Sequence, residues 1–210
     1  MDARSTRRAR PLRGGWRRLA AALALAAITL APDAPFPSAA HGAGTAEAVW
    51  ALLRAGGQVV LIRHAATVPG FGDPPGFRHD DCATQRLLSQ EGRAQARRLG
   101  EAFRARGVPV AEVLSSRWCR CEETARLAFG RSEPWTALDS MHHDRSRAVE
   151  QERELRSRIA RRSGAGTLVL VTHAANISAW TGISPRQGEV VVLTPGPGGE
   201  LKVAGRLVVD

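Results

Sequence analysis

Short apolar runs alternate along the chain with longer segments in which apolar residues recur every three or four positions. The short runs predict strands at residues 59–62 (VVLI), 111–116 (AEVLSS), 134–138 (PWTAL), 167–171 (TLVLV), 189–193 (EVVVL) and 201–209 (LKVAGRLVV). Two of them, VVLI and TLVLV, are apolar throughout, which is typical of strands covered on both faces. The pattern therefore predicts an α/β fold, a three-layer sandwich with a mainly parallel central sheet flanked by helices.

The longer segments predict helices at residues 45–55, 89–106, 122–129, 148–164 and 176–182. Ser89 is placed to cap the second of these helices. The fourth is highly charged, and its apolar stripe consists only of Val149, Leu155 and Ile159. A Gly/Pro-rich loop over residues 68–84 separates the first strand from the second helix, and its length indicates a functional role.

The first forty residues do not continue this pattern. An arginine-rich head (1–18) precedes an apolar run (19–31) and a cluster of small residues (38–44). This order predicts a secretory signal peptide over residues 1–40, followed by a single domain over residues 41–210. The alternative is an uncleaved N-terminal anchor, although the run is shorter than the roughly 20 residues of a spanning helix. We therefore expect a periplasmic or otherwise exported protein that contacts a membrane only through this segment, if it stays uncleaved.

The leader changes the interpretation of the charge. It holds seven arginines against two acids, so its removal lowers the formal charge of the chain from +10 to +5. The full charge would suggest a nucleic-acid partner, whereas the remainder suits an anionic small molecule at least as well. We expect a small anionic ligand and no nucleic acid.

Three cysteines would meet an oxidising compartment if the leader directs export. Cys119 and Cys121 are too close in sequence to pair comfortably with each other in regular structure, so we expect Cys82 to pair with one of them. The third cysteine would then be a free thiol. Because no second pair of ligands stands at metal-binding spacing, neither a metal nor a cofactor is predicted.

Two histidines follow the most apolar strands. The segments VVLIRHAAT (59–67) and LVLVTHAAN (168–176) share one plan, namely an apolar strand, a polar residue, a histidine and two alanines. Ligands of open α/β sheets bind at the carboxyl ends of the strands, where His64 and His173 would meet over one crevice. A single histidine after a strand is more often structural. Two such strand ends together predict a functional site.

A third segment, LSSRWCRCEETA (114–125), also follows a short strand and sets Arg117 and Arg120 near the start of a helix. A guanidinium beside a helix N-terminus favours phosphate, because it adds paired donors to exposed backbone amides. The alternative interpretation is a basic helix start that is simply solvated.

In this order, RHA (63–65), LSQEGRAQA (88–96), RCEETA (120–125) and VTHAAN (171–176) resemble the motifs of the histidine phosphatase superfamily, a group that includes phosphoglycerate mutases. The resemblance extends over about residues 57–194. The segments TQR, SSRWCRC and GEVVVL are also similar to exported bacterial members, among them lipopolysaccharide core heptose phosphate phosphatases.

The resemblance implies that His64 is the nucleophile, which takes the phosphoryl group and forms a phosphohistidine. Arg63, Arg120 and His173 would hold the phosphate oxygens, so the reaction would need no metal. The same resemblance, together with their position in or beside the long loop, suggests Thr67 and Gln85 as residues that line the substrate. Arg117 is expected at the rim of the crevice.

The general acid that protonates the leaving oxygen is less well defined. Some family members carry it directly after the second histidine, where this chain has Ala174, and the usual RHG motif is here RHA with Ala65. The segment ALDSMHHDR (137–145) offers Asp139, His142, His143 and Asp144. We select Asp139 because it directly follows a predicted strand, and Asp144 is the next choice.

Two functions follow from these residues. The first is an exported phosphatase for a small phosphorylated substrate, which by resemblance is an envelope sugar phosphate. The second is a non-catalytic module that binds phosphate or a sugar phosphate in the same crevice. In both, the Gly/Pro-rich loop and segment 137–145 are expected to shape the side of the pocket beyond the phosphate.

Overall fold

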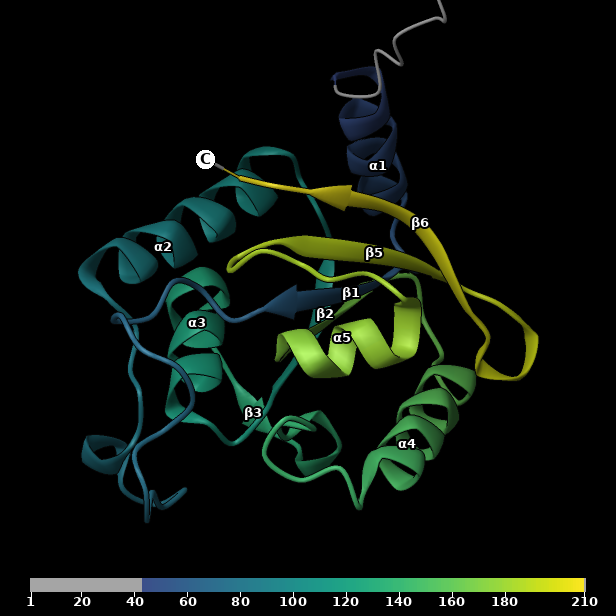
Figure 1. Ribbon diagram of the computed structural model, residues 1–210. Coiled ribbons are helices and arrows are strands. Elements are labelled where there is room, and N and C mark those ends of the chain that lie inside the picture. Colours follow the sequence, from purple (N-terminus) through teal and green to yellow (C-terminus); the bar gives the residue numbers. More distant parts are fainter. Residues whose placement is uncertain (1–42, 210) are drawn as a thin grey trace, which may run out of the picture. The chain divides into compact units, whose positions relative to one another are not determined.

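The computed structural model describes residues 43–209. Its sheet has six strands in the order β3-β2-β4-β1-β5-β6 (Figure 1). In chain order they are β1 (Val59–Arg63), β2 (Val110–Ser115), β3 (Glu133–Pro134), β4 (Thr167–Thr172), β5 (Val190–Pro195) and β6 (Leu201–Leu207). The first four in spatial order are parallel, while β5 is antiparallel to β1 and to β6. The expected α/β fold with a mainly parallel sheet is confirmed.

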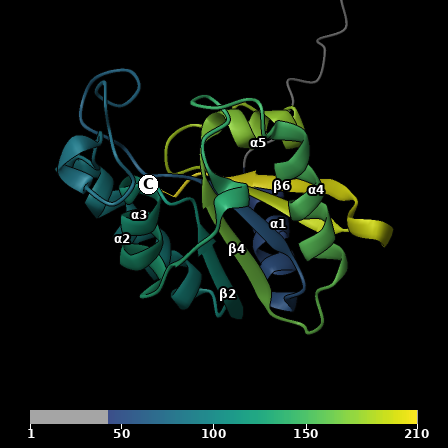
Figure 2. The same cartoon turned by 90° about the horizontal axis from the view of Figure 1, so that it is seen from below.

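Helices cover both faces of this sheet. They are α1 (Ala43–Ala55), α2 (Gln90–Ala105), α3 (Cys119–Phe129), α4 (Ala148–Ala160) and α5 (Ala174–Thr181). Figure 2 shows α2 and α3 on one side of the sheet and α4 and α5 on the other. Alternate residues of β1 divide between the two cores, because side chains of a strand point to opposite faces. Val60 and Ile62 pack with α1, α2 and α3, and Leu61 packs with α4 and α5.

The predicted strand at residues 134–138 was wrong in most of its length. Only Glu133 and Pro134 pair with β2, and residues 136–138 form a 3-10 helix instead. The N–H of Trp135 donates to the Ser115 carbonyl at 2.8 Å, and the chain then turns inward. Leu138 is fully buried in the core beneath α4, a position that continued pairing at the sheet edge would not give it.

The predicted apolar stripe of α4 was wrong at one position. Leu155 and Ile159 are buried, but the side chain of Val149 is 83% exposed. Gln151 is buried instead, and its Nε2 donates to the Asp139 carbonyl at 2.8 Å. A buried amide was not expected, because the carbonyl that it satisfies belongs to the irregular segment before α4.

The predicted leader lies outside the described residues. The signal peptide, its anchor alternative and the start of the predicted domain at residue 41 therefore stay predictions. Across residues 43–209, the helices are too short or too polar for any of them to cross a bilayer.

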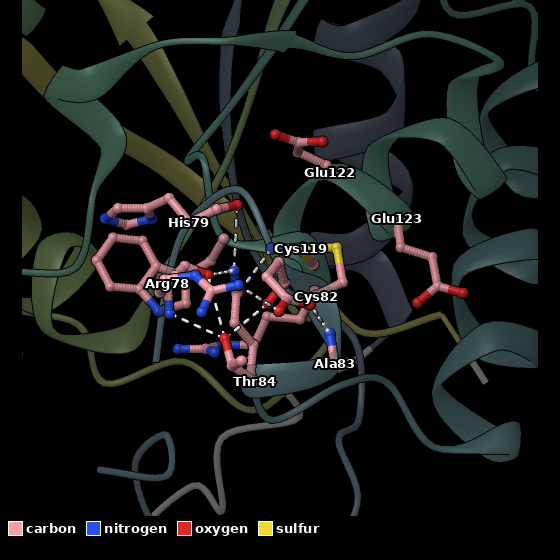
Figure 3. Close-up of a disulfide and its surroundings, with 12 residues drawn as sticks. Arg78, His79, Cys82, Ala83, Thr84, Cys119, Glu122 and Glu123 are labelled. Carbon is pink, nitrogen blue, oxygen red and sulfur yellow. Dashed lines mark hydrogen bonds and ion pairs between the residues drawn. A yellow bond between two sulfur atoms is a disulfide. The ribbon is translucent and has the colours of Figure 1, made fainter. Parts of the chain in front are cut away.

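A disulfide joins Cys82 to Cys119, with 5.7 Å between the two Cα atoms. It decides between the two pairings that the sequence left open, and Cys121 is a buried free thiol. Cys82 belongs to the β1–α2 loop (residues 68–84), and Cys119 is the first residue of α3. Figure 3 shows the bridge, with Arg78 and Thr84 of the loop on one side and Glu122 and Glu123 of α3 on the other. The loop is thus covalently attached to the helix that carries Arg120.

Replacing both bridged cysteines, Cys82→Ser with Cys119→Ser, is expected to lower the free energy of unfolding by roughly 3 to 4 kcal/mol. The reason is that a cross-link between residues 37 positions apart restricts the unfolded chain. Urea unfolding with and without a thiol reductant measures the effect. The wild type and a Cys121→Ala control should lose stability on reduction, whereas the double variant should not respond. An equal response in all three proteins would contradict the prediction.

Candidate functional site

The pairing of β1 with β4 brings the two strand-end histidines together. Arg63 lies opposite Thr172 in the parallel register, and the His64 N–H donates to the Thr172 carbonyl at 3.0 Å. His173 follows β4 directly and is the N-cap residue of α5. The two imidazole rings are 5.5 Å apart between centroids, and both residues are buried. The expected meeting of the two strand ends is therefore present in the structure.

The loop that follows His64 is held by the N-terminal turns of α2. The Ser89 N–H donates to the Ala66 carbonyl at 3.0 Å, and the Ala66 N–H donates to Gln95 Oε1 at 3.1 Å. A Cβ atom on Gly92 would lie 1.8 Å from the Ala66 oxygen, so only glycine allows this approach. The side chain of Ser89 also caps α2, as predicted, by accepting from the Gly92 N–H at 3.0 Å. The LSxxGxxQA pattern thus fixes the backbone beside His64.

A cavity of about 620 Å³ opens at this end of the sheet. Five of the predicted site residues line it, namely Arg63, His64, Thr67, Arg120 and His173. The lining also includes residues that we did not predict as site residues, namely Asp73, Arg86 and Gln187. Gln187 Nε2 donates to Thr67 Oγ1 at 3.1 Å, which fixes that hydroxyl at the wall. Gln85, Arg117 and Asp139 do not line this cavity.

Three guanidinium groups, those of Arg63, Arg86 and Arg120, face this one cavity. Nη1 of Arg63 donates to the Pro185 carbonyl at 3.0 Å, and Nη1 of Arg86 donates to the Gly70 carbonyl at 2.7 Å. No atom of residues 43–209 accepts a hydrogen bond from the Nε–H of any of the three. Burial, followed by the charges of Arg86 and Arg120, lowers the pKa of Arg63, which reflects the crowding of like charges. The cavity is therefore cationic.

Asp73 is the counter-ion of Arg120. Its carboxylate accepts from Arg120 Nη1 at 2.7 Å and from Nη2 at 3.2 Å, and both side chains are buried. The Trp118 indole N–H and the Arg86 backbone N–H donate to the same carboxylate at 2.9 and 3.0 Å. Burial alone would raise the pKa of Asp73, but the hydrogen bonds, first that from Arg120, bring it below its usual value. Among the described residues that line the cavity, Asp73 is the one carboxylate.

The histidines are kept neutral by their surroundings. Burial, followed by the charge of Arg120, lowers the pKa of His64 to about 3. The same two causes bring the pKa of His173 well below its usual value. Nδ1 of His64 lies 2.9 Å from the Ala65 carbonyl oxygen. A carbonyl can only accept, so Nδ1 carries the proton and Nε2 has a free lone pair. His64 is thus in the tautomer of a nitrogen nucleophile.

Asp139 contacts the site indirectly. Its carboxylate accepts from Arg117 Nε at 2.8 Å and from the Arg117 backbone N–H at 3.1 Å. The Ser116 hydroxyl donates to it at 3.4 Å and lies 2.9 Å from His173 Nε2. Arg117 and Asp139 therefore form an ion pair behind His173 and outside the cavity. The roles predicted for these two residues stay predictions, and the geometry connects both to His173.

The remaining predicted residues have structural contacts. Gln85 is buried, donates to the Arg78 carbonyl at 2.8 Å and accepts from the Cys119 N–H at 3.0 Å, so it ties the β1–α2 loop to α3. Asp144, the second choice for the general acid, is exposed and accepts from the Ser146 N–H at 2.8 Å. Neither lines the cavity.

The sequence contained a usable signal for one missed residue but not for another. Arg86 follows Gln85 within the TQR segment, so the resemblance that suggested Gln85 could also have selected its neighbour. Asp73 lies in a Gly/Pro-rich stretch 47 positions before its partner Arg120, and no local pattern joins the two. As for metals, residues 43–209 contain no group of three His, Cys, Asp or Glu side chains that could hold an ion.

One family model matches the part of the chain that contains the motifs RHA, LSQEGRAQA and RCEETA. Residues 59–145 match the family model of the histidine phosphatase superfamily (branch 1). No curated protein matches the chain.

Two solved structures illustrate the shared fold. The alpha-ribazole phosphatase from Shigella flexneri is 15% identical, with 73% of this chain and 96% of that chain covered and a TM-score of 0.51. The product of open reading frame Rv3214 from Mycobacterium tuberculosis is 14% identical, with 73% and 97% covered and a TM-score of 0.53. At these identities the likeness concerns the fold.

The stability of the protein is expected to fall as the pH decreases from 7 to 5. In the unfolded chain an imidazole has a pKa of about 6.5 and takes up a proton over this range, whereas buried His64, with a pKa of about 3, does not. The unfolded state then binds more protons, and His64 alone contributes a loss of roughly 2 kcal/mol. Urea unfolding at pH 7, 6 and 5 should show a shallower pH dependence for His64→Gln than for the wild type. An equal pH dependence of the unfolding free energy in the two proteins would contradict the prediction.

Proposed function

We propose that the chain is a phosphatase of the histidine phosphatase superfamily, whose family model matches residues 59–145, and that it hydrolyses a phosphomonoester through a phosphohistidine on His64. One observation supports this more than any other. Three arginines, of which Arg120 is buried and Arg63 and Arg86 are half-buried, converge on the cavity that contains His64. A phosphate supplies the negative charge that balances these guanidinium groups and oxygens that accept hydrogen bonds from them.

The first step follows from the tautomer of His64. With its proton on Nδ1, the Nε2 lone pair attacks phosphorus, and a P–N bond forms as the ester P–O bond breaks. The leaving oxygen takes a proton and departs as an alcohol. Charge that develops on the phosphoryl oxygens lies among the guanidinium groups of Arg63, Arg86 and Arg120, which need not reorganise.

The second step returns the enzyme to its starting state. A water attacks phosphorus, the P–N bond breaks, and inorganic phosphate leaves with the lone pair restored to Nε2 of His64. We propose that the reaction needs no metal, since the three guanidinium groups supply the positive charge that a metal would otherwise provide.

We propose that Asp139 orients His173 and does not protonate the leaving oxygen. Its carboxylate is bonded to Arg117 and reaches His173 only through the Ser116 hydroxyl. In this role Asp139 orients an imidazole beside the phosphate, as a positioning residue. The acid expected from the sequence is then a water or another group at the rim of the cavity.

Three features support the proposal that the protein acts outside the cytoplasm on a small substrate. The first forty residues have the sequence pattern of an exported leader, and a disulfide between Cys82 and Cys119 is stable in an oxidising compartment. A cavity of about 620 Å³ accommodates a small phosphorylated molecule. An envelope sugar phosphate is the substrate that the resemblance to exported members suggests.

The alternative is a module that binds phosphate without turnover. One observation favours it: among the described residues, the carboxylate that lines the cavity, Asp73, is already paired with Arg120. No carboxylic acid is then left in the lining to protonate a leaving group. Tight phosphate binding without hydrolysis of any ester in a broad panel would support this alternative.

His64→Ala is expected to lower kcat for an aryl phosphate, assayed without added metal, by roughly a thousandfold or more, because it removes the nucleophile. Quenching during turnover with an alkaline denaturant, in which the acid-labile P–N bond survives, should trap a phosphorylated wild-type protein but no phosphorylated variant. His79→Ala is a suitable control, since His79 is half-buried nearby but does not line the cavity. Activity that survives the loss of His64, or that requires a divalent ion, would refute the mechanism.

Gly92→Ala is expected to lower kcat by about tenfold to a hundredfold, because its Cβ would push away the Ala66 carbonyl and displace the loop after His64. Gly100→Ala is the matched control within α2, since its Cβ would lie 1.9 Å from the Ala128 oxygen, away from the site. Both substitutions should destabilise the protein by about 1 to 3 kcal/mol. Comparison of kcat with urea unfolding separates the two effects, and an equal loss of kcat in both variants would count against the positioning role.

A further inference from the structure

The cavity has two walls of different character. One side is formed by the three arginines, which make it cationic, and by the two neutral, buried histidines. The β1–α2 loop forms the other wall with five consecutive uncharged residues, Val68, Pro69, Gly70, Phe71 and Gly72. The side chain of Phe71 is 88% exposed and that of Val68 is 42% exposed, although both line the cavity. A group bound beside the phosphate would therefore meet an apolar, solvent-open rim.

Although Phe71 is exposed, a residue of a second loop packs against its ring. The rings of Phe71 and His142 lie 5.1 Å apart between centroids at an interplanar angle of 84°. His142 also lines the cavity and comes from the segment before α4. The neighbouring His143 packs in the same edge-on manner on Phe77, with centroids 4.7 Å apart. Aromatic contacts thus join the two loops at the rim.

The rim is also attached to the cationic side. Arg86 Nη1 donates to the carbonyl of Gly70, and Arg120 pairs with the carboxylate of Asp73. These anchors lie one residue before and two residues after Phe71. The position of the Phe71 ring is therefore set relative to the same arginines that would hold a phosphate.

We infer that Phe71, together with His142, forms a subsite for the leaving group, and that this subsite takes an uncharged ring one or two bonds from the phosphate. The inference rests on the proposed function, because it assumes that the phosphate lies on the arginines. An exposed aromatic face binds the face of a planar ring or the apolar face of a saturated ring. A leaving group with a second charge finds no ion-pair partner on the wall of residues 68–72.

The inference is tested with phosphonates, which keep the phosphate-like group but are not hydrolysed. Calorimetry on the full chain compares benzylphosphonate and cyclohexylmethylphosphonate with propylphosphonate. Wild type should bind benzylphosphonate about tenfold more tightly than propylphosphonate. Comparable preference for the saturated ring would indicate a sugar-like ligand, whereas preference for the benzyl compound alone would indicate an aromatic one.

Phe71→Ala should reduce the ratio of benzyl to propyl affinity to about one, and Phe71→Trp should restore it. Because both ligands carry the same phosphonate group, any effect of a substitution on binding of that group cancels in the ratio. Val149→Ala is the matched control, since that side chain is 83% exposed but lies on α4 outside the cavity lining, and it should keep the wild-type ratio. A ratio near one in the wild type, or one unchanged by Phe71→Ala, would overturn the inference.

Failure of the proposed function has a different signature. In that case, benzyl phosphate would not be hydrolysed by the wild type although benzylphosphonate binds with the expected preference. That result would support a ring-binding subsite in a protein without turnover. Hydrolysis of benzyl phosphate without a preference for ring-containing phosphonates would support the phosphatase proposal and refute the proposed subsite.

Discussion

The parallel pairing of β1 with β4 is the constraint on which the candidate site depends. Arg63 and Thr172 share one register position, so the residues that follow both strands emerge side by side at the same edge of the sheet. Neither histidine is positioned by a flexible loop. The backbone bond between His64 and Thr172 continues the sheet pairing by one residue, and the N-terminal turns of α2 hold the chain immediately after it. A one-residue change of register would point the two histidines to different faces.

Electrostatics makes the candidate site suited to an anion and makes it costly to the folded protein. Three arginines share one cavity with a single carboxylate among the described residues of its lining. Burial, together with these charges, keeps both histidines neutral, so the protein avoids adding two more cations to the same volume. An anion bound among the guanidinium groups would offset part of their mutual repulsion, while His64 stays neutral, as the attack of its Nε2 on phosphorus requires.

The sequence predicted those features that depend on local patterns. Apolar strands that end in Arg-His and Thr-His indicated His64 and His173, and Arg120 was found because it begins a helix after a strand. The features that were missed depend on contacts between distant segments. Asp73 belongs to the site because it pairs with Arg120, which is distant in sequence. Asp139 pairs with Arg117 and lies outside the cavity lining. The segment of residues 136–138 turned from strand to 3-10 helix because burial of Leu138 outweighed a strand-like composition.

The attachment of the β1–α2 loop has a thermodynamic consequence for ligand binding. Its glycines and prolines would suggest a segment that becomes ordered only around a ligand, but it is anchored by the disulfide of Cys82, by Asp73 on Arg120, and by Gln85 just beyond its end. The loss of conformational entropy in this wall accompanies folding, not binding. The cavity is preorganised, and its affinity for a ligand depends on the contacts it offers without a further ordering cost.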